Sequence, residues 1–108
     1  MPRLASVRAS TRRDKKMMAV FETRDGHAKT VHFGARGCGD FPAYYKLDPV
    51  MAAAKRRAYI ARHRVRENWA DPTTPGALSR FILWEKPTAT ASIAAFRRRF
   101  RLTRARRS

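Results

Sequence analysis

The residue types that most often carry metal or nucleophilic chemistry are scarce in this sequence. A structural zinc site needs about four nitrogen or sulfur ligands held together. The available nitrogen and sulfur ligands are Cys38, His27, His32 and His63. They show neither CxxC nor HxxxH spacing. Cys38 and His32 could be drawn as a nucleophile pair, but no residue supplies an orienting group or an oxyanion site for them. We therefore predict no metal site and no catalytic cysteine.

The carboxylates and the glycine-rich segment 34–39 form no catalytic pattern either. Two-metal nucleases need clustered carboxylates. The acidic residues in the central part of the chain are Asp40, Asp48, Glu67 and Asp71. Their spacing is not typical of such enzymes. A phosphate-binding loop needs Gly-Lys-Ser/Thr at the start of a helix, whereas "GARGCGDFP" continues into Phe41-Pro42. We predict a sharp connection at this segment and a protein that is not an enzyme and uses no cofactor.

Positive charge is the dominant chemical feature of the chain. It has 25 Lys and Arg against 8 Asp and Glu, which gives a formal net charge of +17 over 108 residues. Most of the basic residues lie in three blocks, 1–16, 55–66 and 97–108. Such a charge opposes the compact state and attracts polyanions, and arginine grips phosphate or carboxylate with a planar fork of donors. The residues predicted to bind the polyanion are Arg12, Arg13, Lys15, Lys16, Lys55, Arg62, Arg66, Arg97, Arg98, Arg101, Arg104, Arg106 and Arg107.

Each basic block also has an explanation that needs no ligand. Arginines at 97–101 would stabilise the C-terminal end of a helix through its dipole, and the residues after them would be a frayed tail. The block at 55–66 would be a solvated helix face, and a GC-rich genome would raise the arginine content. The Arg- and Ser-rich start of the chain is typical of a mitochondrial transit peptide as well as of a basic arm.

The segment 16–34 has the pattern of a β-hairpin. Asp25-Gly26 supplies the two positive-φ positions of a type I′ turn between two runs of apolar residues. A two-stranded hairpin is marginally stable alone, so we expect one face of it to pack on helices. The cross-strand pairs expected on one face are Glu22–Lys29, Val20–Val31 and Met18–Phe33.

Three helices are expected after the hairpin. Asp48-Pro49 gives the first one an N-cap and a proline at its first position. Its expected buried stripe, from +3/+4 spacing, is Met51, Ala54, Ala58, Ala61 and Val65. Lys55, Tyr59, Arg62 and Arg66 recur at the same spacing on another face, which is either solvated or in contact with phosphate.

Two shorter helices complete the pattern. Thr74-Pro75 is expected to cap a short helix that Lys86-Pro87 ends. The residues expected to face inward from it are Leu78, Phe81 and Ile82. The last helix is expected from about Thr88 to Arg101, and its apolar stripe is Ala89, Ile93, Phe96 and Phe100.

These elements predict a small single domain of the α+β class, with one β-hairpin packed on about three helices and basic arms at both ends. The expected limits are a basic arm at 1–15, a globular domain at 16–101 and a basic tail at 102–108. The single Cys38 excludes an internal disulfide and is typical of a reducing compartment. No apolar run approaches the roughly 20 residues of a membrane span.

Several short motifs resemble a known family. The run "KTVHFGARG…DF" and the later "YIARHR", "ENW", "TPGALSRFILW" and "KPT" are similar to a small domain family of unknown function that large nucleocytoplasmic (giant) DNA viruses encode. The resemblance covers about residues 29–100. It implies a viral origin and a virion protein, and it brings no known activity or catalytic residue.

Charge and resemblance together predict a non-enzymatic, strongly basic structural protein, such as a minor capsid protein. It would bridge nucleic acid or acidic capsid surfaces within a virion, and it would be found in the virion and the infected host cell. The alternative is an RNA-binding ribosomal-type protein, possibly organellar, located on the ribosome. DNA, RNA and an acidic protein all remain open as the partner, and no small-molecule substrate is expected.

Overall fold

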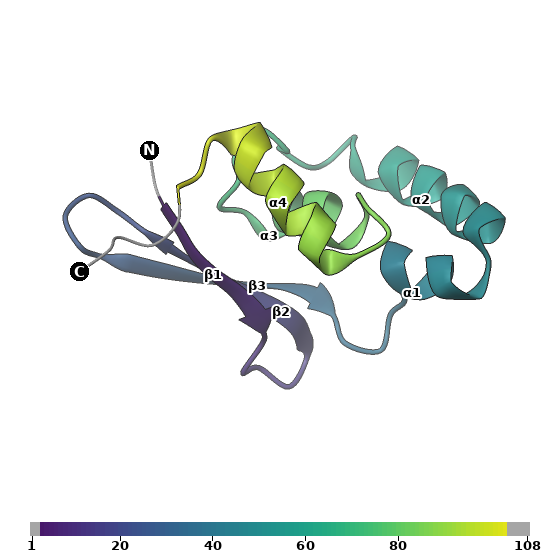
Figure 1. The fold of residues 1–108 in the computed structure, drawn as a ribbon, viewed down its shortest axis with the longest axis horizontal. Coiled ribbons are helices and arrows are strands. Elements are labelled where there is room, and N and C mark those ends of the chain that lie inside the picture. Colours follow the sequence, from purple (N-terminus) through teal and green to yellow (C-terminus); the bar gives the residue numbers. More distant parts are fainter. Residues whose placement is uncertain (1–2, 104–108) are drawn as a thin grey trace.

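A three-stranded antiparallel sheet forms one layer of the protein (Figure 1). The structure is a computed structural model that describes residues 3–103. The strands are β1 (Arg3–Ala9), β2 (Lys15–Glu22) and β3 (Ala28–Ala35), in the spatial order β1-β2-β3. The helical segments are α1 (Phe41–Leu47), α2 (Pro49–His63), α3 (Pro75–Leu78), the π-helical turn η1 (Ser79–Leu83) and α4 (Ala89–Phe100). The chain is a small single-domain α+β protein, as its sequence predicts.

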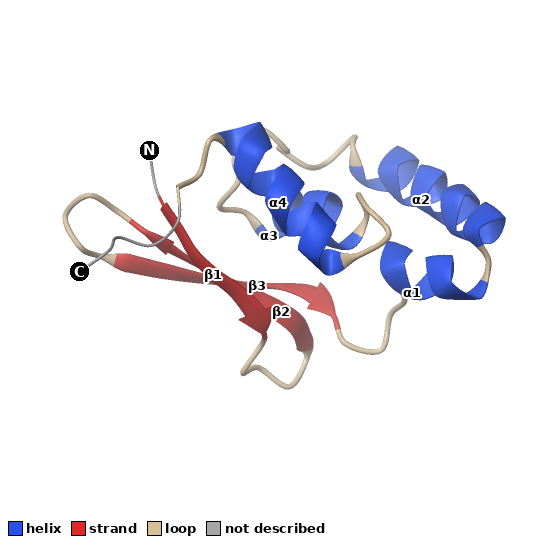
Figure 2. Ribbon diagram, viewed as in Figure 1, coloured by secondary structure: helices blue, strands red, loops and turns tan. Residues whose placement is uncertain are grey.

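The helices occupy one side of the sheet (Figure 2). α3 and η1 lie against β3, α4 packs on η1, and α1 and α2 pack on each other beyond the end of β3. The core between these layers contains large side chains that are fully buried, namely Leu4, Phe21, Phe33, Leu78, Ile82 and Phe96. No described helix combines the length and the apolar character that a bilayer crossing requires.

β1 is a correction to the sequence analysis, which placed residues 1–15 in an arm outside the domain and expected a two-stranded hairpin. Arg3–Ala9 instead pairs with β2 along its whole length, and Leu4 has no exposed surface. β1 supplies hydrogen-bond partners to the N–H and C=O groups at the edge of β2, which would otherwise have to bond to water. Leu4 and the half-buried Val7 are three residues apart and reach the core together only because the register shifts between Leu4 and Ser6, so the sequence shows no simple alternation.

The register of the β2–β3 hairpin differs by one residue from the predicted one. Glu22 faces Ala28, Phe21 faces Lys29, and Ala19 faces Val31. The loop has three residues rather than two, because the Thr23 N–H donates to the His27 carbonyl. Gly26 has φ +86°, and among residues 3–103 no aspartate has a positive φ. This is a turn followed by a left-handed glycine, which Asp-Gly favours as readily as a type I′ turn.

The shifted register exchanges the faces of β2. Ala19 and Phe21 point into the core with Val31 and Phe33, whereas the predicted register placed Val20 there. A one-residue slip always moves a strand's side chains to the other face, because the period of a strand is two.

The helix starts follow the capping signals in the sequence. The Asp48 carboxylate accepts hydrogen bonds from the N–H groups of Val50 and Met51, Thr74 caps α3, and Thr88 caps α4. The predicted starts of these three helices are therefore confirmed. α1 was not predicted. The Asp40 side chain caps it by accepting from the Ala43 N–H, which makes "GDFP" a helix start as well as a sharp connection.

The buried face of α2 is not the predicted alanine stripe. Ala52 and Tyr59 are buried, whereas Ala54, Ala58 and Ala61 are exposed and Val65 is 74% exposed. Burying an alanine removes little apolar area from water, while burying a tyrosine removes far more. The aromatic residue therefore decides which face of α2 turns inward.

The chain closes against the sheet after α4. Phe96 is 1% exposed, as predicted, and Phe100 is half-buried against the core. Arg101 then takes a left-handed conformation (φ 54°), and Leu102 returns to the core. The Leu4 N–H donates to the Thr103 carbonyl, so both β1 and residues 102–103 belong to the domain that was expected to span 16–101.

Gly26 offers a test of the hairpin. A Cβ atom at Gly26 would meet no other atom within 4 Å, so a substitution there acts through its positive φ alone. We expect Gly26→Val to lower the free energy of unfolding by about 1–3 kcal/mol, because a β-branched residue resists the left-handed region. Asp25→Asn is the matched control and should leave the thermal midpoint nearly unchanged. Equal shifts for the two variants would contradict the turn described above.

Candidate polyanion-binding site

A cleft of about 680 Å³ opens beside the end of β3. The glycine-rich connection 34–39 forms one wall, and α2 with α3 and η1 forms the other. A Cβ atom at Gly39 would overlap the ring of Tyr44, so the loop approaches α1 closely enough that only glycine fits. The charged side chains that line the cleft are Lys15, Lys16, Lys55, Arg62 and Glu67, and His63 lies beside Glu67.

The cleft brings two of the three basic blocks together. Lys15 and Lys16 come from the start of β2, and Lys55 and Arg62 come from α2. All four are among the predicted polyanion-binding residues. Lys55 and Arg62 are exposed and Lys15 is half-exposed, and Lys55 Nζ lies 5.0 Å from the centroid of the Tyr44 ring. Like charges gathered in a hollow raise the local concentration of an anion.

Lys16 has a structural task in the same cleft. Its Nζ lies 2.9 Å from Asp40 Oδ2 and also donates to the Cys38 carbonyl. This lysine ties the glycine-rich loop to β2, and Asp40 in turn caps α1. It shapes the wall of the cleft and has less charge to offer a ligand than Lys15 or Lys55.

Three aromatic rings form a stack along the cleft wall. Tyr59 stacks on Trp84 at a centroid distance of 4.8 Å and on His63 at 4.2 Å. Burial, followed by the negative charge of Glu67, raises the pKa of the Tyr59 hydroxyl to about 12. The hydroxyl therefore remains a neutral donor at physiological pH. His63 is the most exposed ring of the three, and its Nδ1 lies 3.5 Å from Glu67 Oε1.

In the third basic block, the predicted residues that the structure describes lie at the other end of the sheet. Arg98 and Arg101 are exposed near the start of β1, where Arg3 bridges to Thr103. β1 spans six residue steps, so about 20 Å separates this end from the cleft end. Arg97 donates to the carbonyls of Leu4 (2.7 Å) and Thr103 (3.3 Å), so it holds the chain end against β1.

The remaining predicted residues that the structure describes are exposed and lie in turns. Arg12 and Arg13 are exposed on the β1–β2 loop, where Arg12 lies 3.1 Å from Asp14. Arg66 is exposed in the turn after α2. Arg104, Arg106 and Arg107 lie outside the described residues.

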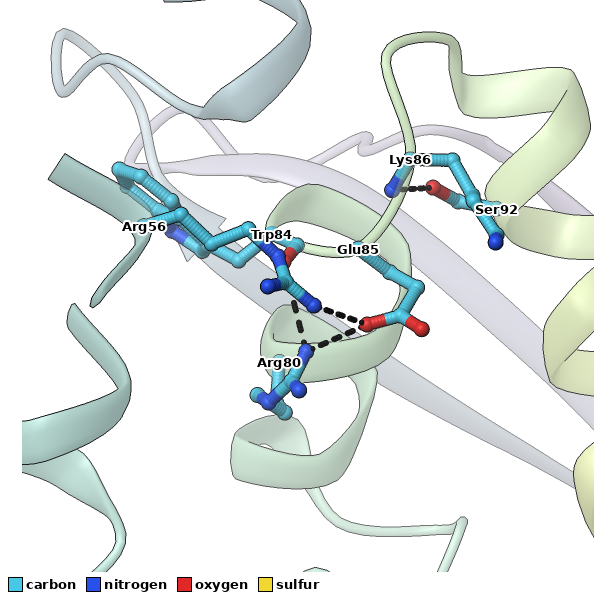
Figure 3. Close-up of polar contacts among 6 residues, drawn as sticks. All are labelled: Arg56, Arg80, Trp84, Glu85, Lys86 and Ser92. Carbon is cyan, nitrogen blue, oxygen red and sulfur yellow. Dashed lines mark hydrogen bonds and ion pairs between the residues drawn. The ribbon is translucent and has the colours of Figure 1, made fainter. Parts of the chain in front are cut away.

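Two arginines absent from the prediction hold the helical layer together. Arg56 of α2 and Arg80 of η1 each place a guanidinium nitrogen 2.8 Å from the same oxygen of Glu85 (Figure 3). Both also donate to the Trp84 carbonyl, and the Lys86 N–H donates to the Ser92 hydroxyl beside them. The sequence contains a hint of this contact: Glu85 is the only acidic residue after Asp71, in a part of the chain that is rich in arginine.

The ionised form of Glu85 is stabilised by this contact. Burial opposes ionisation, but the hydrogen bonds from Arg80 and Arg56 outweigh it and lower the pKa of Glu85 below its usual value of 4.5. A carboxylate that accepts two charged hydrogen bonds favours its charged form. The carboxylate offsets one of the two positive charges, and both guanidinium groups are engaged in contacts within the fold.

The potential metal ligands remain dispersed. Within residues 3–103, no group of three or more His, Cys, Asp and Glu residues comes together in a way that could hold a metal ion. Cys38 is exposed, and His32 Nδ1 lies 2.7 Å from the Ser10 hydroxyl. His32 therefore has a partner other than Cys38.

Comparison with known proteins adds one match. The model of a family of unknown function, DUF5754, matches residues 5–43. This segment contains most of the sheet, the glycine-rich loop and the start of α1, so it contributes Lys15 and Lys16 to the cleft but not Lys55 or Arg62. It overlaps the resemblance described above over residues 29–43. Neither a curated protein nor a solved structure matches the chain.

Glu85 provides a test of the helical junction. We expect Glu85→Gln to lower the free energy of unfolding by about 1–3 kcal/mol, because two guanidinium groups lose their charged acceptor. The folded-state pKa of Glu85 is depressed, so its contribution is complete above about pH 4.5 and is lost as the pH falls through the lower folded-state value. Thermal midpoints of wild type and variant should therefore differ at neutral pH and converge at acidic pH.

Asp14→Asn is the matched control for this test. The Arg12–Asp14 pair is exposed at the β1–β2 loop, with both side chains more than half accessible. Exposed pairs contribute little to stability, so this variant should melt like wild type. A Glu85→Gln variant that also melts like wild type at neutral pH would contradict a structural role for the Glu85 contact.

Proposed function

We propose that this protein is a non-enzymatic, strongly basic nucleic-acid-binding protein that serves a structural role in a large assembly. The observation that carries the proposal is the convergence of Lys15, Lys55 and Arg62 on one cleft from segments far apart in the sequence. The formal net charge is +17, so cations gathered in one cleft repel each other and destabilise the folded protein. A bound anion would offset this repulsion. Phosphate groups of nucleic acid provide that anion in a repeating array.

The placement of the acidic residues supports the same proposal. Several of the eight acids satisfy groups of the fold itself: Asp40 and Asp48 cap helices, and Glu85 pairs with two arginines. The exposed arginines at Arg98 and Arg101 remain available at the far end of the sheet. Two cationic regions toward opposite ends of the sheet, whose strand β1 is about 20 Å long, allow one molecule to contact two strands or two sites on one nucleic acid, which suits bridging.

A second candidate partner is an acidic protein surface. Leu47, Val50 and Val65 are 77%, 79% and 74% exposed on or beside α2. Arg57 of α2 and Arg64 directly after it are also exposed, and α2 has no acid in its first turn. Apolar side chains bordered by cations match a partner with the opposite charge. Such a contact would complement nucleic-acid binding within a virion, consistent with a minor capsid protein of a large DNA virus.

The assembly itself is open to direct measurement. A virion protein would be found in purified particles and in the infected host cell, whereas the ribosomal-type alternative would sediment with ribosomal subunits. Co-purification with ribosomes that survives high salt would contradict the virion proposal and favour RNA.

The proposed affinity has a defined salt dependence. Each neutralised phosphate contributes a slope of about −0.9 to the plot of log affinity against log salt, so five to eight contacts give about −4 to −7 for a duplex. We expect this slope in a fluorescence-anisotropy titration, with little dependence on base sequence. A slope near zero would contradict nucleic-acid binding and leave the acidic protein as partner.

Variants locate the contacts that produce this slope. Replacing Arg98 and Arg101 with Gln should weaken duplex binding and reduce the slope by about one for each arginine that contacts phosphate. The same change at Arg104, Arg106 and Arg107 tests the end of the chain. Arg24→Gln, on the exposed β2–β3 loop, removes a charge outside the predicted binding residues and should change the slope least.

A further inference from the structure

We propose that the cleft binds one unpaired nucleotide of a single strand, with its base on the aromatic stack and its phosphates on the cleft lysines. This inference rests on the proposed nucleic-acid binding and assigns it a ligand form. The volume of about 680 Å³ lies within the range of about 300–1,000 Å³ typical of small-ligand pockets. A pocket of this size admits a base that has left its stack, as in proteins that bind extruded or single-stranded nucleotides.

The aromatic stack provides the surface for the base. Trp84 and Tyr59 are 9% and 8% exposed, so they form the buried part of the stack. The His63 side chain is 39% exposed and borders the cleft. An imidazole already stacked on a tyrosine is held in one orientation, and the base can add to it with little loss of side-chain entropy. Stacking on aromatic rings is sequence-tolerant because every base has a π face.

The charged side chains indicate which end of the cleft would hold the phosphates and which end the base. Arg62 precedes His63 on α2, and Lys55 lies two turns earlier on the same helix, next to Tyr44. Lys15 lines the same cleft from the start of β2. Glu67 lies at the His63 end and would repel a phosphate there. The phosphates therefore belong at the Lys15 and Lys55 end and the base at the His63 end.

The glycine-rich loop completes the phosphate end. Gly37, Cys38 and Gly39 line the cleft, and Lys16 with Asp40 fixes the loop to β2. A Cβ atom at Gly37 would meet no other atom within 4 Å, so a strand can approach the backbone closely there, whereas the Tyr44 ring covers Gly39. The loop does not open a long helix as a phosphate-binding loop would, and the charge for the phosphates comes from side chains on the other elements.

The test compares a fluorescent oligothymidine of about 12 nucleotides, a length within the usual single-strand site sizes, with a duplex of equal length at one salt concentration. We expect His63→Ala to weaken oligothymidine binding by about five- to tenfold, the lower part of the range for loss of one stacked base. Its salt slope should stay unchanged because no charge contact with phosphate is lost. Duplex binding should change by less than about twofold.

Two variants control for folding and for a general loss of histidine. His63→Phe keeps a stacking face and should bind the oligothymidine within about twofold of wild type. His27→Ala removes an exposed histidine from the β2–β3 loop, away from the cleft, and should have no effect. Lys15→Gln with Lys55→Gln should weaken oligothymidine binding and reduce its slope by about 0.7 for each lost phosphate contact.

The outcomes separate this inference from the function on which it rests. Binding of neither nucleic acid would overturn the proposed function itself. Duplex binding with the expected slope, but with oligothymidine binding that is the same for His63→Ala, His63→Phe and wild type, would overturn the nucleotide site alone. Loss of oligothymidine binding in His63→Ala together with recovery in His63→Phe would support it.

Discussion

The contact of Glu85 with Arg56 and Arg80 is the interaction on which the helical layer depends. It joins α2 to η1 through one carboxylate, and both arginines also bond the Trp84 carbonyl. With α2 held in this position, Tyr59 meets Trp84 and the inner face of α2 becomes one wall of the cleft. Without the carboxylate, two partly buried guanidinium groups would repel each other, which costs more than a lost surface pair.

The scarcity of acidic residues affects the whole molecule in the same way as it affects the Glu85 contact. With 25 basic and 8 acidic residues, the fold places acids where they stabilise its own structure, at helix caps and at the Glu85 junction. Some arginines also act as structural donors, as Arg97 does toward Leu4 and Thr103. Among the remaining cations, Lys15, Lys55 and Arg62 line the cleft, and Arg98 and Arg101 are exposed at the end of α4. A partner with many phosphates would relieve the repulsion that the fold tolerates.

Local signals in the sequence predicted the helices better than the sheet. Asp48-Pro49, Thr74-Pro75 and Thr88 are caps that act within three residues, so reading them needs no knowledge of the rest of the fold. The register of the hairpin depends on whether Asp25-Gly26 forms a two-residue or a three-residue loop, which the pair permits equally. β1 was not predicted from the sequence, because its pairing with β2 is not encoded by neighbouring residues and its arginines resemble those of a solvated arm.

The sequence by itself determined the α+β class, the starts of the predicted helices and the excess of positive charge, since each of these follows from composition or from neighbouring residues. Only the tertiary structure decided which basic residues share a site. Lys15 and Lys55 meet because the sheet and α2 pack around the glycine-rich loop, whereas Arg97 is used inside the fold. The inward face of α2 was also decided there, because the area that Tyr59 buries against Trp84 exceeds what a row of alanines offers.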